Sequence, residues 1–212
     1  MMEDRKRRSS SKALIGWNRL QLRDVKGGIK LNTPDARIYP TLSKPIVWGT
    51  VTGTFVGSEE AGDLSLVSNV SIVPHVGDKV VMMQVDDGRW ELPGGTLEAG
   101  EFYLDGLRRE LLEELGAELA SYRIFGHFLC RSSAPAPYRP YIPHPSFRRV
   151  VGYGDVIVVG QPLNPADGER VLRVEAVDIG EAVRRFQGGG RFDLAELYRL
   201  GHAIRMHAAA GQ

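Results

Sequence analysis

The sequence predicts an α/β (α+β) fold, and three observations carry this prediction. Short segments rich in β-branched residues and separated by turn residues predict strands, one segment with leucines at helical intervals predicts an amphipathic helix, and the C-terminal part holds two further helical segments. The chain has 212 residues, of which 42% are apolar and 25% charged, so it can bury a complete core. We therefore expect one compact domain with extensions.

The N-terminal residues 1–12, MMEDRKRRSSSK, are basic and serine-rich, which is typical of a disordered, solvated tail. The apolar stretch that a secretory signal needs does not follow, and no window approaches the roughly 18 apolar residues of a membrane span. We therefore expect a cytoplasmic protein without a membrane partner. The formal net charge of +1 does not favour nucleic acid either.

Residues 13–65 mix short apolar groups with turn residues and show no sustained helical period. This pattern predicts an extended arm or a small β appendage ahead of a main domain over residues 66–212. The arm could pack on its own domain or cross to a second subunit and build a homodimer, and the sequence leaves both open.

Six segments have the composition of strands and three that of helices. The expected strands are residues 47–56, 70–73, 79–85, 122–131, 150–159 and 171–177. The expected helices are residues 101–115, 180–187 and 193–206. Residues 132–145 contain five prolines, which predicts a shaped loop, and long loops inside compact domains are often functional.

The helix expected over residues 101–115 combines a core face with a row of carboxylates. Its leucines recur at helical spacing, and Gly116 stands where a C-terminal cap would be. Glu110, Glu113 and Glu114 then share one turn beside the leucine stripe. Like charges at this spacing repel, so the arrangement calls for a cation, and hard divalent cations prefer carboxylate oxygens.

The residues around this row suit the same chemistry. Arg109 lies four residues before Glu113, where an ion pair would hold the carboxylate in one orientation. Gly94 and Gly95 allow the backbone to approach the helix or a ligand closely, and Glu101 near the helix start can accept hydrogen bonds from free N–H groups.

The run GGTLEAGEFYLDGLRRELLEELGA resembles the signature of the Nudix hydrolases. That signature is a glycine, five residues, a glutamate, seven residues, and then Arg-Glu-aliphatic-any-Glu-Glu-any-Gly-aliphatic. Its fixed positions are met by Gly95, Glu101, Arg109, Glu110, Leu111, Glu113, Glu114 and Gly116, with the small Ala117 in the last aliphatic place. The resemblance covers approximately Leu66 to His207.

The resemblance implies an α/β/α sandwich around a mixed sheet, preceded by the N-terminal appendage. It implies that Glu110, Glu113 and Glu114 bind Mg²⁺ or Mn²⁺, that Arg109 and Glu101 brace the site, and that a metal-polarised water attacks phosphorus. The expected reaction is hydrolysis of a phosphoanhydride bond in a nucleoside diphosphate linked to another moiety, such as a nucleotide sugar, ADP-ribose, a dinucleotide or a modified nucleoside triphosphate.

Residues outside the signature supply further candidates. The family often adds an acidic residue from a loop, and Glu169 is the first candidate, with Asp155 and Glu175 behind it. Arg148 and Arg149 follow the proline-rich segment and have the geometry for phosphate contacts. Three aromatic residues in or next to that segment could stack on a base, and they are Tyr138, Tyr141 and Phe147.

Two other functions fit the same motif. A nucleotide-sensing Nudix domain without turnover commonly lacks signature glutamates, and none is missing here. An isomerase of the isopentenyl-diphosphate type is disfavoured, because no cysteine lies in a matching position and the signature has the intact hydrolase form. Cys130, the one cysteine, lies in an apolar run that predicts a buried space-filling side chain. The sequence holds no HExxH, GxSxG or P-loop motif, which disfavours zinc protease, serine hydrolase and P-loop NTPase functions.

Overall fold

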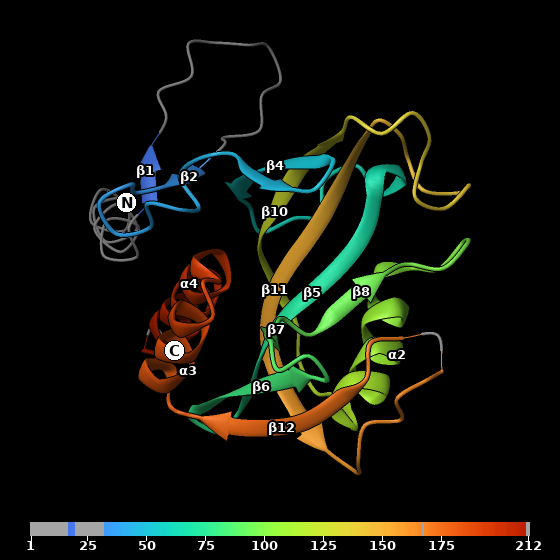
Figure 1. The fold of residues 1–212 in the computed structure, drawn as a ribbon. Coiled ribbons are helices and arrows are strands. Elements are labelled where there is room, and N and C mark those ends of the chain that lie inside the picture. Colours follow the sequence, from blue (N-terminus) through green and yellow to red (C-terminus); the bar gives the residue numbers. More distant parts are fainter. Residues whose placement is uncertain (1–16, 20–31, 167, 211–212) are drawn as a thin grey trace, which may run out of the picture.

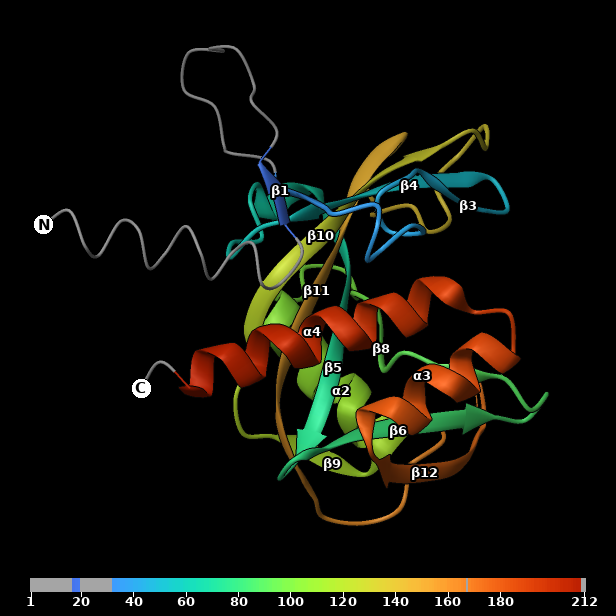
Figure 2. The same ribbon diagram turned by 90° about the vertical axis from the view of Figure 1, so that its left-hand side faces the viewer.

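The computed structural model describes residues 17–19, 32–166 and 168–210 and shows a mixed β-sheet with helices on both faces (Figure 1). Helix α2 (Tyr103–Leu115) covers one face, and α3 (Ile179–Gly188) and α4 (Phe192–Ala210) cover the other. Figure 2 shows α4 lying across the sheet with α3 beside it. The predicted mixed fold of strands and helices is confirmed.

Eight of the described strands follow one another across the sheet in an order that differs from their order in the chain. That order is β1 (Trp17–Arg19), β2 (Asn32–Pro34), β4 (Val51–Gly57), β10 (Arg123–Ser132), β11 (Ser146–Val158), β5 (Val67–Val76), β6 (Lys79–Val85) and β12 (Val171–Val177). Strands β11 and β5 run parallel, and the other neighbours in this order are antiparallel.

Four short strands and a 3₁₀ turn complete the described elements. They are β3 (Ile46–Trp48), η1 (Leu64–Leu66), β7 (Trp90–Glu91), β8 (Gly94–Thr96) and β9 (Ala117–Leu119). Strand β8 pairs with β5 and β9 with β11, so both ends of α2 lead into strands attached to the centre of the sheet. The sheet thereby holds the signature segment at two points.

Alternation along the strands builds a separate core on each face of the sheet. On β5, Val70 and Ile72 face α2 and pack with its buried leucines, whereas Val73 faces the opposite side and packs in the core that α3 and α4 cover. The α2 leucines in the first core are Leu107, Leu111 and Leu115. Full burial of one leucine contributes about 2 kcal/mol, so this stripe fixes which side of α2 faces outward.

Several element boundaries differ from the expected ones. The strand expected over 47–56 is divided by a turn at Gly49, whose φ of 57° is accessible to glycine, into β3 and β4. The strand expected over 70–73 is longer, because β5 spans Val67–Val76. Helix α2 begins at Tyr103 rather than at Glu101, since residues 98–102 form the turn that leads into it.

The N-terminal region is described in part. Residues 51–57 form β4, which pairs with β10 over seven residue positions and so extends the main sheet. The expected boundary near residue 65 and the homodimer contact of the arm stay predictions, and the tail expected over 1–12 lies outside the described residues. Within the described ranges, no helix has the length and apolar character to cross a membrane.

Candidate active site

Glycines set the path of the backbone at the entrance and the exit of the signature segment. A Cβ added at Gly94, where φ is 125°, would lie 2.2 Å from the carbonyl oxygen of Val70 on β5. Gly116 ends α2 in the left-handed conformation, with φ at 60°, and its N–H donates to the carbonyls of Leu111 and Leu112. Strand β8 can therefore lie close to β5, and α2 ends before it passes beyond the sheet.

Glu114 is the innermost carboxylate of the site. One of its oxygens accepts a hydrogen bond from the N–H of Gly94 at 2.8 Å. Burial raises the pKa of this carboxyl well above its usual range, and the charges of Glu110, Glu169 and Glu113 act in the same direction. Among the described residues no lysine, arginine or histidine forms an ion pair with Glu114.

Glu110 lies directly against the backbone of β8. A Cβ added at Gly95 would lie 2.2 Å from Oε1 of Glu110, so this contact requires a residue without a side chain. Burial raises the pKa of Glu110, and the Arg109 guanidinium partly offsets that effect through an ion pair of 3.0 Å. Ionisation of the neighbouring carboxyl groups of Glu110 and Glu114 is thus energetically unfavourable.

Arg109 gathers the remaining carboxylates around one guanidinium. It forms a two-point ion pair with Glu101, in which both nitrogen to oxygen distances are 3.0 Å. Its Nη1 contacts Glu110 at 3.0 Å and Glu113 at 3.2 Å, and its Nη2 donates to the carbonyl of Thr96 at 3.3 Å. The bond from Arg109 lowers the pKa of Glu101, which keeps that carboxylate charged.

The donor set fits a hard divalent cation in an open site. Among the described residues, no three acidic, histidine or cysteine side chains already converge on one point as the ligands of a closed site do. One turn of α2 instead presents several carboxylates, and the most enclosed of them has no cationic partner in the described chain. Mg²⁺ commonly binds through one or two carboxylates and completes its coordination with waters and phosphate oxygens.

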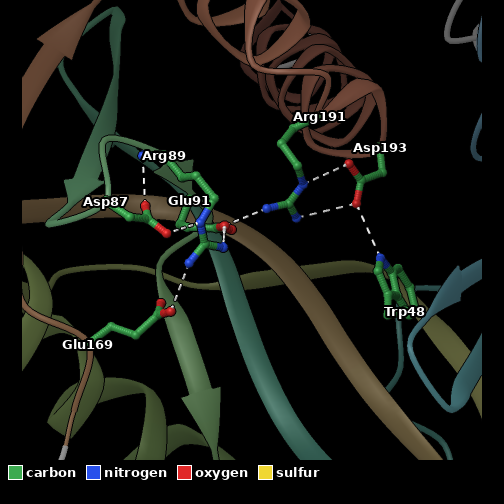
Figure 3. Close-up of polar contacts among 7 residues, drawn as sticks. All are labelled: Trp48, Asp87, Arg89, Glu91, Glu169, Arg191 and Asp193. Carbon is green, nitrogen blue, oxygen red and sulfur yellow. Dashed lines mark hydrogen bonds and ion pairs between the residues drawn. The ribbon is translucent and has the colours of Figure 1, made fainter.

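Glu169 belongs to a chain of ion pairs that starts at Arg89 (Figure 3). Its Oε1 accepts from Nη2 of Arg89 at 3.1 Å, and Arg89 also contacts Asp87 and Glu91. Glu169 is 60% exposed, yet its charge contributes to the raised pKa of Glu114. The loop before β12 therefore brings Glu169 within electrostatic reach of α2.

The same chain continues across the sheet to the start of α4 (Figure 3). Glu91 also accepts from Arg191, which contacts both oxygens of Asp193 at 3.3 and 3.4 Å. Asp193 in turn accepts from the indole nitrogen of Trp48 at 3.4 Å. Sequence reasoning missed these residues, because partners such as Glu91 and Arg191 are 100 positions apart and no motif links them.

The two alternative acidic candidates are engaged elsewhere. Asp155 pairs with Arg205 at 2.7 Å and accepts from the Ser121 hydroxyl at 3.0 Å. Glu175 pairs with Arg173 and Arg185. Neither contributes to the perturbed carboxyls of α2, so Glu169 is the acidic candidate that the structure brings to the site.

Arg148 and Arg149 point to different surroundings, as neighbours on a strand do. Arg148 donates to the carbonyl of Ala61 at 3.0 Å and lies so close to Gly62 that a Cβ there would be 1.6 Å from its Nη1. Arg149 instead lines a cavity of about 410 Å³, together with Thr96. Of the two, only Arg149 faces a space that a ligand can enter.

Comparisons with known proteins agree with the signature. The NUDIX domain model matches residues 66–199. A 37-residue stretch is 57% identical to "Putative 8-oxo-dGTP diphosphatase 2" of Mycobacterium tuberculosis, covering 18% of this chain and 26% of that protein, so the match spans about a quarter of that relative.

Two solved structures are similar at low identity. The NUDIX hydrolase from Nitrosomonas europaea is 20% identical with a TM-score of 0.48, over 68% of this chain and 90% of that one. A variant of the Bacillus subtilis pyrophosphohydrolase BsRppH is 18% identical with a TM-score of 0.45, over 59% and 72%. Since the family model covers well over half of its residues, the chain belongs to the Nudix family.

Proposed function

We propose that the chain is a Mg²⁺- or Mn²⁺-dependent hydrolase that cleaves a phosphoanhydride bond in a nucleoside diphosphate linked to another moiety. The observation that carries this proposal is the Glu114 carboxyl, which is enclosed, has a raised pKa and lies beside Glu110 without a cationic partner in the described chain. A divalent cation offsets such a penalty directly, because it supplies the missing positive charge.

In this proposal Glu110, Glu113 and Glu114 hold the cation, and Arg109 fixes the orientation of two of them from one side. Glu101 acts through Arg109, which it anchors at two points. The bound cation would neutralise charge on the phosphate oxygens and lower the pKa of the attacking water. For phosphoryl transfer, a protein chiefly has to position the reactants and stabilise the charge on the phosphate oxygens.

Glu169 is our candidate for the group that accepts the proton of the attacking water. Its carboxylate is exposed and is held by an ion pair with Arg89. The water oxygen forms the new bond to phosphorus, the anhydride bond to the leaving phosphate breaks, and the water proton passes to the Glu169 carboxylate. Gly94 and Gly95 would bring the β8 backbone close to the substrate phosphates.

The proposed substrates are small nucleotides, and the subclass stays open among nucleotide sugars, ADP-ribose, dinucleotides and modified nucleoside triphosphates. A cytoplasmic location and a homodimer built through the N-terminal arm likewise stay predictions. The sensing function without turnover has no specific observation in its favour, because all signature glutamates are in place around Arg109.

The test is a screen of nucleoside-diphosphate compounds with Mg²⁺ or Mn²⁺, in which a phosphatase converts the products to measurable phosphate. We expect turnover of at least one class by the parent protein and by Glu118→Gln, a control on the exposed side chain of β9. The Glu114→Gln variant should be inactive. Metal-independent turnover, or equal turnover by Glu114→Gln, would overturn the proposal.

A further inference from the structure

The cavity beside Arg149 has a partly apolar lining. It lies between the proline-rich segment and the strands, and its apolar side includes Val51, Pro137, Ile142 and Phe147. Its volume of about 410 Å³ is within the usual range of small-molecule sites, roughly 300 to 1,000 Å³. An aromatic ring that binds here would exchange contact with water for contact with these apolar side chains.

The polar side chains of the cavity are hydroxyls, an amide, an imidazole and one guanidinium. No acidic residue lines it among the described residues, and Asn69 uses its amide internally, donating to Thr96 and accepting from the Ser68 hydroxyl. Arg149 is the one arginine in the lining, and a guanidinium carries only donors. The cavity therefore favours a ligand that presents acceptors toward Arg149.

Arg149 is held in place without consuming its donors. Its Cζ lies 5.3 Å from the ring centre of Trp48 and 5.8 Å from that of Phe147. Its Nε is buried and has no hydrogen-bond partner among the described residues. Trp48 is itself anchored by the bond from its indole nitrogen to Asp193. The aromatic contacts orient the guanidinium, and its two terminal nitrogens have no hydrogen-bond partner in the part of the chain that the structure describes.

The cavity adjoins the carboxylates at Thr96. The Thr96 side chain belongs to the cavity wall, its carbonyl accepts from Arg109, and the preceding Gly95 lies against Glu110. A substrate whose phosphates lie at the α2 carboxylates can thus place its nucleoside in the cavity. Phosphates are better placed at the cation site than among proline and phenylalanine side chains.

We propose that this cavity binds the nucleobase of the substrate and that Arg149 selects a 6-oxopurine, guanine or hypoxanthine. These bases present two adjacent acceptors, O6 and N7, which match the fork of a guanidinium, whereas adenine replaces O6 by an amino donor. The proposal rests on the proposed function, since it assigns the organic part of that substrate. It makes Arg149 a specificity-determining residue rather than a phosphate contact.

The test measures binding by isothermal titration, so it does not depend on turnover. Guanosine, inosine and adenosine 5′-monophosphates and inorganic phosphate are titrated into the full chain with Mg²⁺ present, and into Arg149→Met, Arg149→Lys and the control Arg131→Met. Arg131 is an exposed arginine on β10 outside the cavity lining. Thermal unfolding of each variant checks that it is folded.

We expect the parent and Arg131→Met to bind the two 6-oxopurine nucleotides about tenfold more tightly than the adenine nucleotide. Both Arg149 variants should lose this preference, since lysine keeps the charge but not the fork. Equal affinities in the parent, or a preference that survives in Arg149→Met, would overturn the assignment. So would an equal loss of affinity for all three nucleotides and for inorganic phosphate, because Arg149 would then read phosphate.

The titration and the turnover screen together separate the two proposals. A guanine preference without turnover of any nucleotide would leave the cavity assignment standing and remove the hydrolase. Metal-dependent turnover without any base preference would support the hydrolase and overturn the cavity assignment.

Discussion

The carboxylate of Glu110 lies directly over the α-carbon of Gly95, so that a Cβ at residue 95 would be 2.2 Å from Oε1 of Glu110. The contact joins the strand before the helix to the carboxylate row on the helix. It also gives a reason for a glycine at this position of the signature that is independent of the family pattern.

Substitution of Gly95 by alanine should therefore impair catalysis more than folding. The Glu110 carboxylate is the end of a side chain and can turn aside, so we expect the free energy of unfolding to change little while kcat falls about ten- to a hundredfold. Steady-state kinetics and urea unfolding measure both. Unchanged kcat in folded Gly95→Ala would contradict this role.

Gly116→Ala is the matched comparison for that variant. A Cβ at Gly116 would lie 2.5 Å from the backbone oxygen of Gly160, in a residue with φ at 60°. Backbone atoms cannot turn aside, so we expect a loss of about 2 kcal/mol in the free energy of unfolding. The kcat per folded molecule should be close to that of the parent, which is the opposite outcome to Gly95→Ala.

Glu114→Gln should raise stability and remove activity together. The folded state raises the pKa of Glu114, so at neutral pH its ionised form costs stability relative to the unfolded chain, and a neutral glutamine removes that cost. In the presence of a chelator we expect a higher midpoint of thermal unfolding, with kcat at least about a hundredfold lower when Mg²⁺ is supplied. A variant that is both less stable and fully active would contradict the account.

Arg89 should act as a positioning residue for Glu169. We expect Glu169→Gln to lower kcat about a hundredfold, Arg89→Met to lower it less, and the double variant to match Glu169→Gln alone, because Arg89 works through the 3.1 Å ion pair. KM should change little. The exposed Arg173→Met is the control. Losses that multiply in the double variant, or full activity of Glu169→Gln, would show that the pair has no such function.

His127 should make the protein less stable in mild acid. Burial lowers the pKa of this imidazole to about 4, from an ordinary value of 6.5, and its Nδ1 has no hydrogen-bond partner among the described residues. The unfolded chain takes up the proton first as pH falls, so stability is complete above pH 6.5 and declines toward pH 4. We expect His127 to account for a loss of about 2 kcal/mol between pH 7 and pH 5.

Urea unfolding at several pH values, on the parent and on His127→Asn, measures this contribution. Asparagine does not titrate, so the dependence of the unfolding free energy on pH should be shallower in the variant, whatever its stability at pH 7. Parallel pH dependences would assign the effect to other groups.

The sequence predicted those features of the site that follow from the spacing of neighbouring residues along the helix. The positions of Leu107 and Leu111 determine which side of α2 is buried, and the same periodicity places Glu110 and Glu114 beside it. Gly116 was recognisable as a cap from its place after the last leucine. These inferences need no knowledge of the rest of the fold.

The features of the site that the sequence did not predict depend on contacts between segments that are distant in the chain. Glu169 was a candidate from the sequence, but its partner Arg89 was not, because the two are 80 residues apart and a pattern of nearby charges does not reveal which carboxylate a guanidinium will meet. Strand alternation does show that Arg148 and Arg149 face opposite sides. Which side holds the cavity follows only from the packing of Trp48 and the proline-rich segment against β11.

The most direct test of the account is the binding of Mn²⁺, followed by electron paramagnetic resonance and by the protons released. We expect the parent to bind the ion and to release protons, because carboxyls with raised pKa values must ionise to act as ligands. Binding and proton release should both be lost when Glu110, Glu113 and Glu114 are replaced by glutamine. Undiminished Mn²⁺ binding by that folded triple variant would contradict the central claim.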